Sequence, residues 1–354
     1  MLAACPRSYP RELHRRTLVC SALALVGLGT DALAQSVVMP AANAAARGTG
    51  GLNTLTRNAA NPRTYMLGLP ATELAGIPVG SIINGLSFRA SITASNAATW
   101  PPTDTSWVNY DISVGNAIAL GTWTTTFATN FSGTPVKVRS GGMTIEAGTF
   151  TNNTALPAPQ PNAWGDFYWD FQNPFTYTGG DLAILFSHDG SNQATSNLFL
   201  DTIASVAATG LGYSGTGYNV ATGALTTFSI PRVHYGFGKA CPGTGGKLPN
   251  LVQSNNVTGG GAVTFAIGNG PASAPAVYAF GSNQVNIPLP NGCTLYTPPL
   301  ATLGTTLSAL GRAKFSATLP AGIAATVYVQ SVLLDAGATG GYTASNAVTL
   351  TVKP

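Results

Sequence analysis

Short apolar runs, rather than long amphipathic stretches, make up most of the chain after residue 34. Apolar and polar residues alternate in WVNYDISV (107–114), and as one strand this stretch would place Val108, Tyr110, Ile112 and Val114 on one face. Such a period of two is typical of a sheet that has one solvated face. The 3.6-residue period of a long amphipathic helix does not recur after residue 34. The pattern therefore predicts an all-β protein.

Nine such runs lie between residues 51 and 238, separated by the Gly, Pro and Asn residues that favour turns. We expect strands at Ile82–Ala90, Trp107–Val114, Thr124–Thr129, Val136–Arg139, Met143–Phe150, Asp166–Phe171, Leu182–Ser187, Asn197–Thr202 and Thr226–Tyr235. This density of short strands is typical of a β-sandwich, and we expect a jelly-roll-like one over residues 51–238. Residues 35–50 are expected to form a flexible leader.

The composition changes to loop-forming residues in GKACPGTGG (238–246), so we place a domain boundary between residues 238 and 239. The second segment, 239–354, has seven short runs of its own. We expect strands at Ala262–Ile267, Ala276–Phe280, Gln284–Ile287, Thr294–Tyr296, Ala313–Ala317, Ala325–Leu334 and Ala347–Val352. Seven short strands in this length predict a smaller immunoglobulin-like β-sandwich.

Residues 1–34 have the pattern of a signal peptide. Four arginines precede an apolar run, LVCSALALVGLG (18–29), and Ala32-Leu33-Ala34 supplies a small-x-small cleavage site. The apolar run is about 12 residues long, which is too short to span a bilayer. We see no later apolar run long enough to span one. The sequence therefore predicts a secreted or cell-surface protein without a membrane span after signal removal.

Charge and cysteine content change once residues 1–34 are removed. Four of the 16 basic and two of the 12 acidic residues lie there, which leaves 12 and 10 and a net charge of +2. So sparse and balanced a charge does not suggest a nucleic-acid partner. Two cysteines remain, Cys241 and Cys293, and in an exported chain they most simply form one disulfide, with two free thiols as the alternative. Closing a loop of about 50 residues would contribute roughly 4 kcal/mol on the chain-entropy model.

Several stretches resemble one type of exported bacterial two-domain β-sandwich protein. In the first segment they are IINGLSFRAS (82–91), TWPPTDTSWVNYDISVG (99–115) and FTYTGGDLAILF (175–186). In the second, GKLPNL (246–251), NGCTLY (291–296), ATLP (317–320) and VYVQSVLLD (327–335) resemble a C-terminal module of large secreted bacterial proteins. The resemblance implies export and two β domains, and it carries over no site residue.

The stretch AWGDFYWDFQNPFTYTGGDLAILFSHDG (163–190) concentrates aromatic and acidic residues. As a strand, it would direct Phe167, Trp169 and Phe171 to the core, and Asp166, Tyr168 and Asp170 to a solvated face. Exposed aromatic rings could stack on sugars, and the candidates for such a ligand-binding platform are Trp164, Tyr168 and Trp100. Buried aromatic anchors are the alternative.

The segment SHDGSN (187–192) offers oxygen ligands on a turn. Asp189 and Asn192, together with Asp181 at the start of the preceding strand, are candidate calcium ligands, because calcium takes six to eight oxygens. The alternative is a plain hairpin turn, for which Asp-Gly is a common sequence. We expect no cofactor, with calcium as the one candidate.

Catalytic patterns are weak. The candidate carboxylates of a polysaccharide hydrolase or lyase are Asp111, Glu146, Asp166, Asp170 and Asp201. Along one strand Asp166 and Asp170 would lie about 13 Å apart, whereas a glycosidase pair needs roughly 5–9.5 Å. The sequence has no G-x-S-x-G, H-E-x-x-H or C-x-x-C motif, and we interpret His188 and His234 as structural. One G-x-G-x-x-G, residues 210–215, precedes no helix pattern, so we treat it as a chance match.

Three functions remain after these patterns are weighed. We expect a non-catalytic extracellular structural or adhesive protein, and no enzyme. The alternative is a glycan-binding module, calcium-assisted or not, and a secreted polysaccharide hydrolase or lyase is the least favoured. The expected partners are extracellular polysaccharide or other surface proteins.

Overall fold

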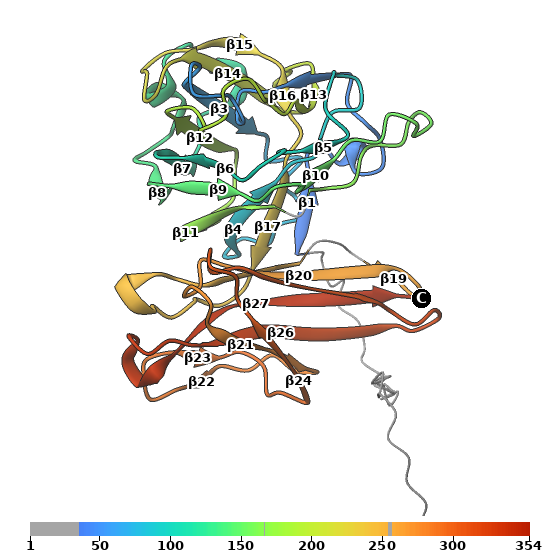
Figure 1. The fold of residues 1–354 in the computed structure, drawn as a ribbon, viewed down its shortest axis with the longest axis vertical. Helices are drawn as coiled ribbons and strands as arrows, with labels where there is room; N and C mark the ends of the chain where they lie inside the picture. Colours follow the sequence, from blue (N-terminus) through green and yellow to red (C-terminus); the bar gives the residue numbers. More distant parts are fainter. Residues whose placement is uncertain (1–34, 166, 254–256) are drawn as a thin grey trace, which may run out of the picture. The chain divides into compact units, whose positions relative to one another are not determined.

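The computed structural model describes residues 35–165, 167–253 and 257–354, which belong to one compact unit (Figure 1). The expected signal peptide and Asp166 lie outside the described residues. Within these ranges the protein is all-β and has no α-helix. Its helical segments are short 3-10 turns at Ala41–Asn43 (η1), Leu120–Thr122 (η2), Phe127–Asn130 (η3), Thr244–Gly246 (η4) and Thr339–Gly341 (η5).

Two larger antiparallel sheets dominate the first part of the chain. The four-stranded sheet has the order β1 (Ser36–Val38), β17 (Arg232–Gly236), β4 (Ile82–Ser87) and β11 (Trp169–Thr176). The six-stranded sheet has the order β15 (Ala224–Thr226), β14 (Leu211–Thr216), β3 (Arg63–Leu69), β12 (Leu182–His188), β7 (Tyr110–Asn116) and β8 (Val136–Arg139). Smaller sheets join β16 (Phe228–Ser229), β13 (Leu200–Ile203) and β2 (Gly50–Leu52); β10 (Phe150–Thr151) and β5 (Thr99–Trp100); and β6 (Thr105–Trp107) and β9 (Met143–Ile145).

A single apolar core packs the two larger sheets into a β-sandwich. It takes alternate residues from the four-stranded sheet, such as Trp169 and Phe171, and from the six-stranded sheet, such as Ile184 and Phe186. Trp169 Nε1 also donates a hydrogen bond across this core to the hydroxyl of Tyr110, at 2.9 Å. The prediction that Phe167, Trp169 and Phe171 belong to the core is therefore confirmed.

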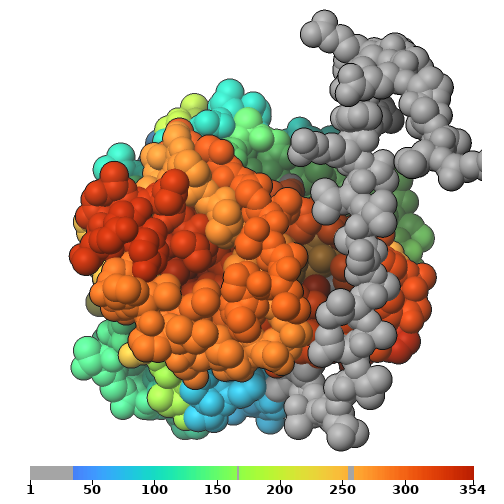
Figure 2. All heavy atoms as spheres, turned by 90° about the horizontal axis from the view of Figure 1, so that it is seen from below, coloured from blue at the N-terminus to red at the C-terminus, as the bar shows by residue number. Residues whose placement is uncertain are grey.

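The last part of the chain forms a second sandwich around its own core. A three-stranded sheet, β18 (Asn250–Gln253), β20 (Ala262–Gly268) and β25 (Ala313–Thr318), packs on a five-stranded sheet. The latter has the order β19 (Val257–Thr258), β27 (Tyr342–Lys353), β26 (Ala325–Leu334), β21 (Pro275–Gly281) and β24 (Ala301–Thr306), and β22 (Ile287–Pro288) pairs with β23 (Thr294–Leu295). Figure 2 shows a face on which these C-terminal residues, in orange and red, predominate.

The disulfide between Cys241 and Cys293 is formed, as the cysteine content predicts. Both cysteines are buried, and they pack with Ala344 of β27 in a small apolar cluster. The bridge joins the loop after β17 to the loop before β23, across 52 residues of sequence.

The structure differs from the sequence prediction in the leader, in several of the predicted strands, and in strands that were not predicted, among them β3, β14, β18 and β24. Residues 36–38 are not a flexible leader but form β1 along β17, and Met39 is fully buried, because the apolar run SVVM extends the sheet and its core. Residues 124–129 do not form a strand; η3 covers the second face of the six-stranded sheet with Phe127 and Phe131. Val108 is 78% exposed, because the chain turns between β6 and β7.

The second face of β11 is also not the solvated face that alternation predicts. Tyr168 and Asp170 are both buried. Residues of the second sandwich cover them: Asn250 of β18 hydrogen-bonds the hydroxyl of Tyr168, and Arg312 pairs with Asp170. The alternation was predicted correctly, but the neighbour that covers this face is distant in sequence.

Candidate functional site

A pocket of about 320 Å³ lies beside Tyr168, and we call it the junction pocket. One wall comes from β4, β17, residues 163–165 and residues 167–168, and the other from β18, β20 and β25. Ser87, Arg232 and His234 supply polar groups to the first wall. Val252 and Ala266 are apolar residues of the second wall, which also includes Thr264 and Lys314. The pocket therefore combines cationic and hydroxyl groups with apolar surface.

Strand β17 directs Arg232 and His234 to the same side, since alternate residues of a strand share a face. Ser87 of β4 pairs with Arg232 in the sheet, which brings its hydroxyl next to both. Val233 and Tyr235, the alternating residues, enter the apolar core. One face of β17 thus lines the pocket with Arg232 and His234, and its other face packs into the apolar core.

Two arginines lie over the indole of Trp164. The guanidinium carbon of Arg89 is 5.0 Å from the ring centroid and that of Arg232 is 4.2 Å from it. Such contacts attract a cation to the electron-rich ring. Trp164 is half-buried, and because two cations already occupy its ring, less of it is available for stacking on a sugar.

Arg89 has partners on all sides. Its Nε donates to Asp201 Oδ2 at 2.8 Å, and its two terminal nitrogens donate to the carbonyls of Asn43 and Ala46. The backbone N–H of Gly48 donates to both oxygens of Asp201. Burial lowers the pKa of Arg89 and raises that of Asp201, and the attraction between the two groups opposes both shifts. This pair is closed to a ligand.

Arg232 is different, because among the described residues its guanidinium has neither a carboxylate partner nor a side-chain hydrogen bond. The side chain is only 6% exposed. Burial, and then the charge of Arg89, lowers the pKa of Arg232 to about 9, so the group remains a cation at neutral pH. The junction pocket therefore contains a buried cation to which no described residue supplies an anion.

Ser87 and His234 form a second polar pair in this pocket. Ser87 Oγ lies 2.7 Å from His234 Nε2, and His234 Nδ1 lies 3.3 Å from the carbonyl of Gln253. A carbonyl only accepts, so this network assigns the proton to Nδ1 and makes Nε2 the acceptor of the serine hydroxyl. Burial, and then the charge of Arg232, lowers the pKa of His234 to about 3.

A serine beside a histidine is also the arrangement that activates a nucleophile. A general base acts best when its pKa lies near the working pH, and His234 is far below that. An imidazolium beside the unpaired Arg232 would also be repelled. The pair therefore fits a structural hydrogen bond better than a catalytic dyad.

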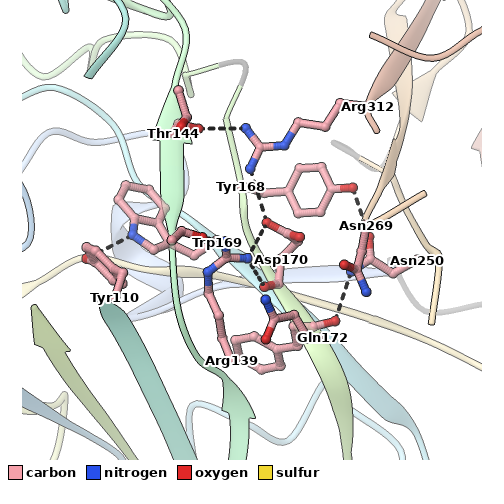
Figure 3. Close-up of polar contacts among 12 residues, drawn as sticks. Tyr110, Arg139, Thr144, Tyr168, Trp169, Asp170, Gln172, Asn250, Asn269 and Arg312 are labelled. Atoms are coloured by element: carbon pink, nitrogen blue, oxygen red, sulfur yellow. Dashed lines mark hydrogen bonds and ion pairs between the residues drawn. The ribbon is translucent and has the colours of Figure 1, made fainter. Parts of the chain in front are cut away.

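Next to the junction pocket, a polar cluster holds Asp170 (Figure 3). Arg139 donates to Asp170 Oδ1 at 3.0 Å, and Arg312 donates to the same oxygen at 3.2 Å. Burial raises the pKa of Asp170, but the two guanidinium groups outweigh it and hold the pKa below its ordinary value. Arg312 also donates to the carbonyl of Thr144. This cluster, which we call the Asp170 cluster, is a structural contact between the two sandwiches.

Tyr168 lies between the junction pocket and a smaller hollow of about 230 Å³ that Glu146 and Arg312 help to line. Its hydroxyl donates to Asn250 Oδ1 at 2.9 Å, and burial raises the pKa of the phenol well above its ordinary value. Gly268 makes room for it, since a Cβ at that position would overlap the hydroxyl. Tyr168 is thus a buried anchor rather than an exposed sugar platform.

The three aromatic candidates are not brought together as one exposed plane. Trp100 is 1% exposed and packs against Phe150, with the ring centroids 6.0 Å apart. Tyr168 is buried, and Trp164 alone remains half-buried at the junction pocket.

The calcium candidates are divided between the two ends of one strand. Asp181 precedes β12 and accepts a hydrogen bond from the N–H of Ala71, whereas Asp189 follows β12. The intervening strand separates them by roughly 25 Å, so they cannot bind one ion. Asp189 and Asn192 do share a loop region, where their side-chain oxygens accept from Asn109 and from the N–H of Ser106.

The candidate carboxylates that the structure describes do not form a pair either. Asp170 and Asp201 are held by arginines, and Asp111 pairs with Lys137 at 2.9 Å. Glu146 lines the smaller hollow, and Asp166 lies outside the described residues. His188 is buried and accepts from the N–H of Gly190 at Nδ1, so it has a structural role.

Sequence reasoning did not identify Arg232 or Ser87 as site residues. The alternation in PRVHYGFG (231–238) places Arg232 and His234 on one face, and two polar residues on one face of an apolar strand were the available signal.

In the described part of the chain, no group of three or more His, Cys, Asp or Glu side chains is placed to hold a metal ion. The same residues include no helix that is long and apolar enough to cross a membrane.

No protein-family model matches this sequence, and a search of curated proteins found no match.

Proposed function

We propose that this chain is a non-catalytic extracellular protein with a structural or adhesive role, exercised through an uncharged edge strand of its second sandwich. The observation that carries the proposal is the edge strand β24, ATLGTT. It lies at the end of the five-stranded sheet and, among the described residues, pairs with β21 alone. Four of its six residues are exposed, and Leu300 beside it is 65% exposed.

An exposed edge strand offers unpaired backbone groups to another chain, and proteins that stay monomeric usually place charges or proline there. Strands β21, β24 and β26 contain no charged residue. The edge of β25, by contrast, includes Lys314. The absence of charge on β24 therefore favours association over solubility.

The arrangement of the acidic residues also supports a non-catalytic role. Glycoside hydrolysis needs two carboxylates that flank one bond. Three of the candidates, Asp111, Asp170 and Asp201, are each paired with a cation. The N-terminal pattern of residues 1–34 and the Cys241–Cys293 disulfide support an extracellular location.

Bead clustering tests this proposal. Beads coated with residues 35–354 should cluster, and beads coated with the double variant Thr302→Lys/Thr306→Lys should cluster several-fold less, because lysine blocks edge pairing. Ser316→Lys, on the exposed face of β25, is the matched control and should cluster like the unmodified chain. The same beads are incubated with polysaccharides. Release of reducing ends in proportion to the protein would overturn the non-catalytic role, and equal clustering of all variants would overturn the role of β24.

Glycan binding is a second candidate, and one observation favours it. Trp164 remains half-buried at the junction pocket beside the unpaired cation of Arg232.

A further inference from the structure

We propose that the junction pocket binds a small carboxylate ligand, of the class of an acidic sugar, and that the guanidinium of Arg232 holds the carboxylate. This inference deepens the glycan-binding candidate by naming the charged group of the ligand. It does not depend on the edge strand β24.

Arg232 is a buried charge, and an isolated buried charge destabilises a fold. Taking a cation out of water is unfavourable unless an anion or several hydrogen bonds replace the water. Arg232 is nine-tenths buried, on an internal strand flanked by β1 and β4, and no carboxylate within the described residues contacts it. Its cation–π contact with Trp164 satisfies none of its N–H groups. Arg232 lines the pocket, so a ligand bound there can accept from its guanidinium.

Arg89 provides an internal standard, because it lies over the same indole. The chain supplies Arg89 with the carboxylate of Asp201 and two carbonyls. Thus the described residues supply a carboxylate to one of these two buried arginines and none to the other, within one local environment. We take this difference to mark Arg232 as the position at which a ligand supplies the anion.

The shape and walls of the pocket select the class of ligand. A guanidinium matches the two oxygens of a carboxylate in a bidentate pair. A volume of about 320 Å³ is at the small end of ligand pockets, which suits one sugar ring better than an extended ligand. Phe167 and Ala266 offer apolar surface to the C–H groups of a ring, and the Ser87 hydroxyl lies beside Arg232 for a ring hydroxyl.

Calorimetric titration of residues 35–354 tests the proposal. Galacturonic acid is the probe, and its methyl ester keeps the ring but removes the charge. We expect the ester to bind at least about tenfold more weakly than the acid, since a charge-assisted pair contributes about that much. Acetate should compete with the acid at higher concentration. An oligogalacturonate arm distinguishes a polymeric source of the ligand from a free acid.

Two variants locate the site. Arg232→Gln should weaken binding of the acid at least about tenfold. Lys239→Gln removes one positive charge from an exposed position outside the pocket and should leave the affinity unchanged. If Arg232→Gln does not fold, the comparison of acid and ester on the unmodified chain still decides.

The outcomes separate the two levels of the proposal. Equal affinity for acid and ester, or unchanged affinity in Arg232→Gln, would overturn the carboxylate site while leaving glycan binding in place. No binding of the acid, ester or acetate would overturn both. Acid binding that depends on Arg232 supports the site, whether the oligomer binds or only the free acid does.

Discussion

The Asp170 cluster and the junction pocket lie on either side of Tyr168, and both contain a buried charged side chain that sequence alternation would expose to solvent. Asp170 meets two arginines, one of them from the second sandwich. Arg232 faces the same sandwich but meets no acid there among the described residues. The two arginines explain why Asp170 can be buried. For Arg232, a bound ligand would supply the anion that the described residues do not.

Acid should affect the whole chain most. Burial lowers the pKa of His188 to about 4 and that of His234 to about 3, so both are neutral when folded. In the unfolded chain each would take up a proton near about pH 6.5. The unfolded state then binds more protons below pH 6.5, and stability falls as the pH drops, by about 1.4 kcal/mol per pH unit for each histidine.

Urea unfolding at pH 7.5, 6.5, 5.5 and 4.5 measures this loss. The contribution of Asp170 should disappear only at lower pH, because its pKa lies below the ordinary value of a carboxyl group. His234→Asn should flatten the slope by about half, since one of two buried histidines is then absent. A free energy of unfolding that does not change between pH 6.5 and 4.5 would contradict the neutral histidines.

Asp170→Asn removes the paired charge of the Asp170 cluster. It leaves Arg139 and Arg312 without their anion, and breaking a buried pair costs about 3–5 kcal/mol. Arg312 is partly exposed, so the lower end of this range is expected. Asp111→Asn, which removes the partner of the half-exposed Lys137, is the control and should cost less than about 1 kcal/mol. Equal losses in urea unfolding would show that the Asp170 cluster is not structural.

Arg232→Gln removes the buried cation of the junction pocket. No described residue is an acidic partner of Arg232. Its removal should therefore change the free energy of unfolding by less than about 1 kcal/mol, because relief of desolvation offsets the lost cation–π contact. A loss as large as that of Asp170→Asn would reveal an internal partner and remove the contrast between the two sites.

EDTA should have the smallest effect. Asp181 and Asp189 lie at opposite ends of β12, and their carboxylates accept backbone N–H groups. We therefore expect the thermal midpoint of residues 35–354 to be the same with calcium and with EDTA. A calcium-dependent rise that Asp189→Ala abolishes would instead establish a metal site on that loop.

Much of the fold could be predicted from local pattern. Leu182–His188 and Ala325–Leu334 are apolar runs bounded by turn residues, and they are strands at almost the predicted limits. Strand β3 (Arg63–Leu69), in the middle of the six-stranded sheet, was missed, because it begins with Arg63 and Thr64 and Gly68 interrupts its apolar residues. A Cβ there would overlap Trp123, a contact that no local pattern contains.

The site could be predicted less well than the fold. Alternation correctly separates Phe167, Trp169 and Phe171 from Tyr168 and Asp170, but it cannot tell whether the second face meets water or another sandwich. That information depends on Asn250 and Arg312, which lie about 80 and 140 residues away. Arg232 was not identified for the same reason: its role depends on the residues that the fold places around it, and local alternation does not contain that information.

The most direct measurement is the NMR spectrum of the arginine Nε–Hε groups during titration with galacturonic acid. Residues 35–354 contain seven arginines, which is few enough to assign by substitution. We predict that the Arg232 signal shifts with the acid and not with its methyl ester, while the signal of Arg89, whose Nε already donates to Asp201, stays in place. If the Arg232 signal does not shift, or shifts equally with the acid and the ester, the result would contradict the proposed carboxylate site at Arg232.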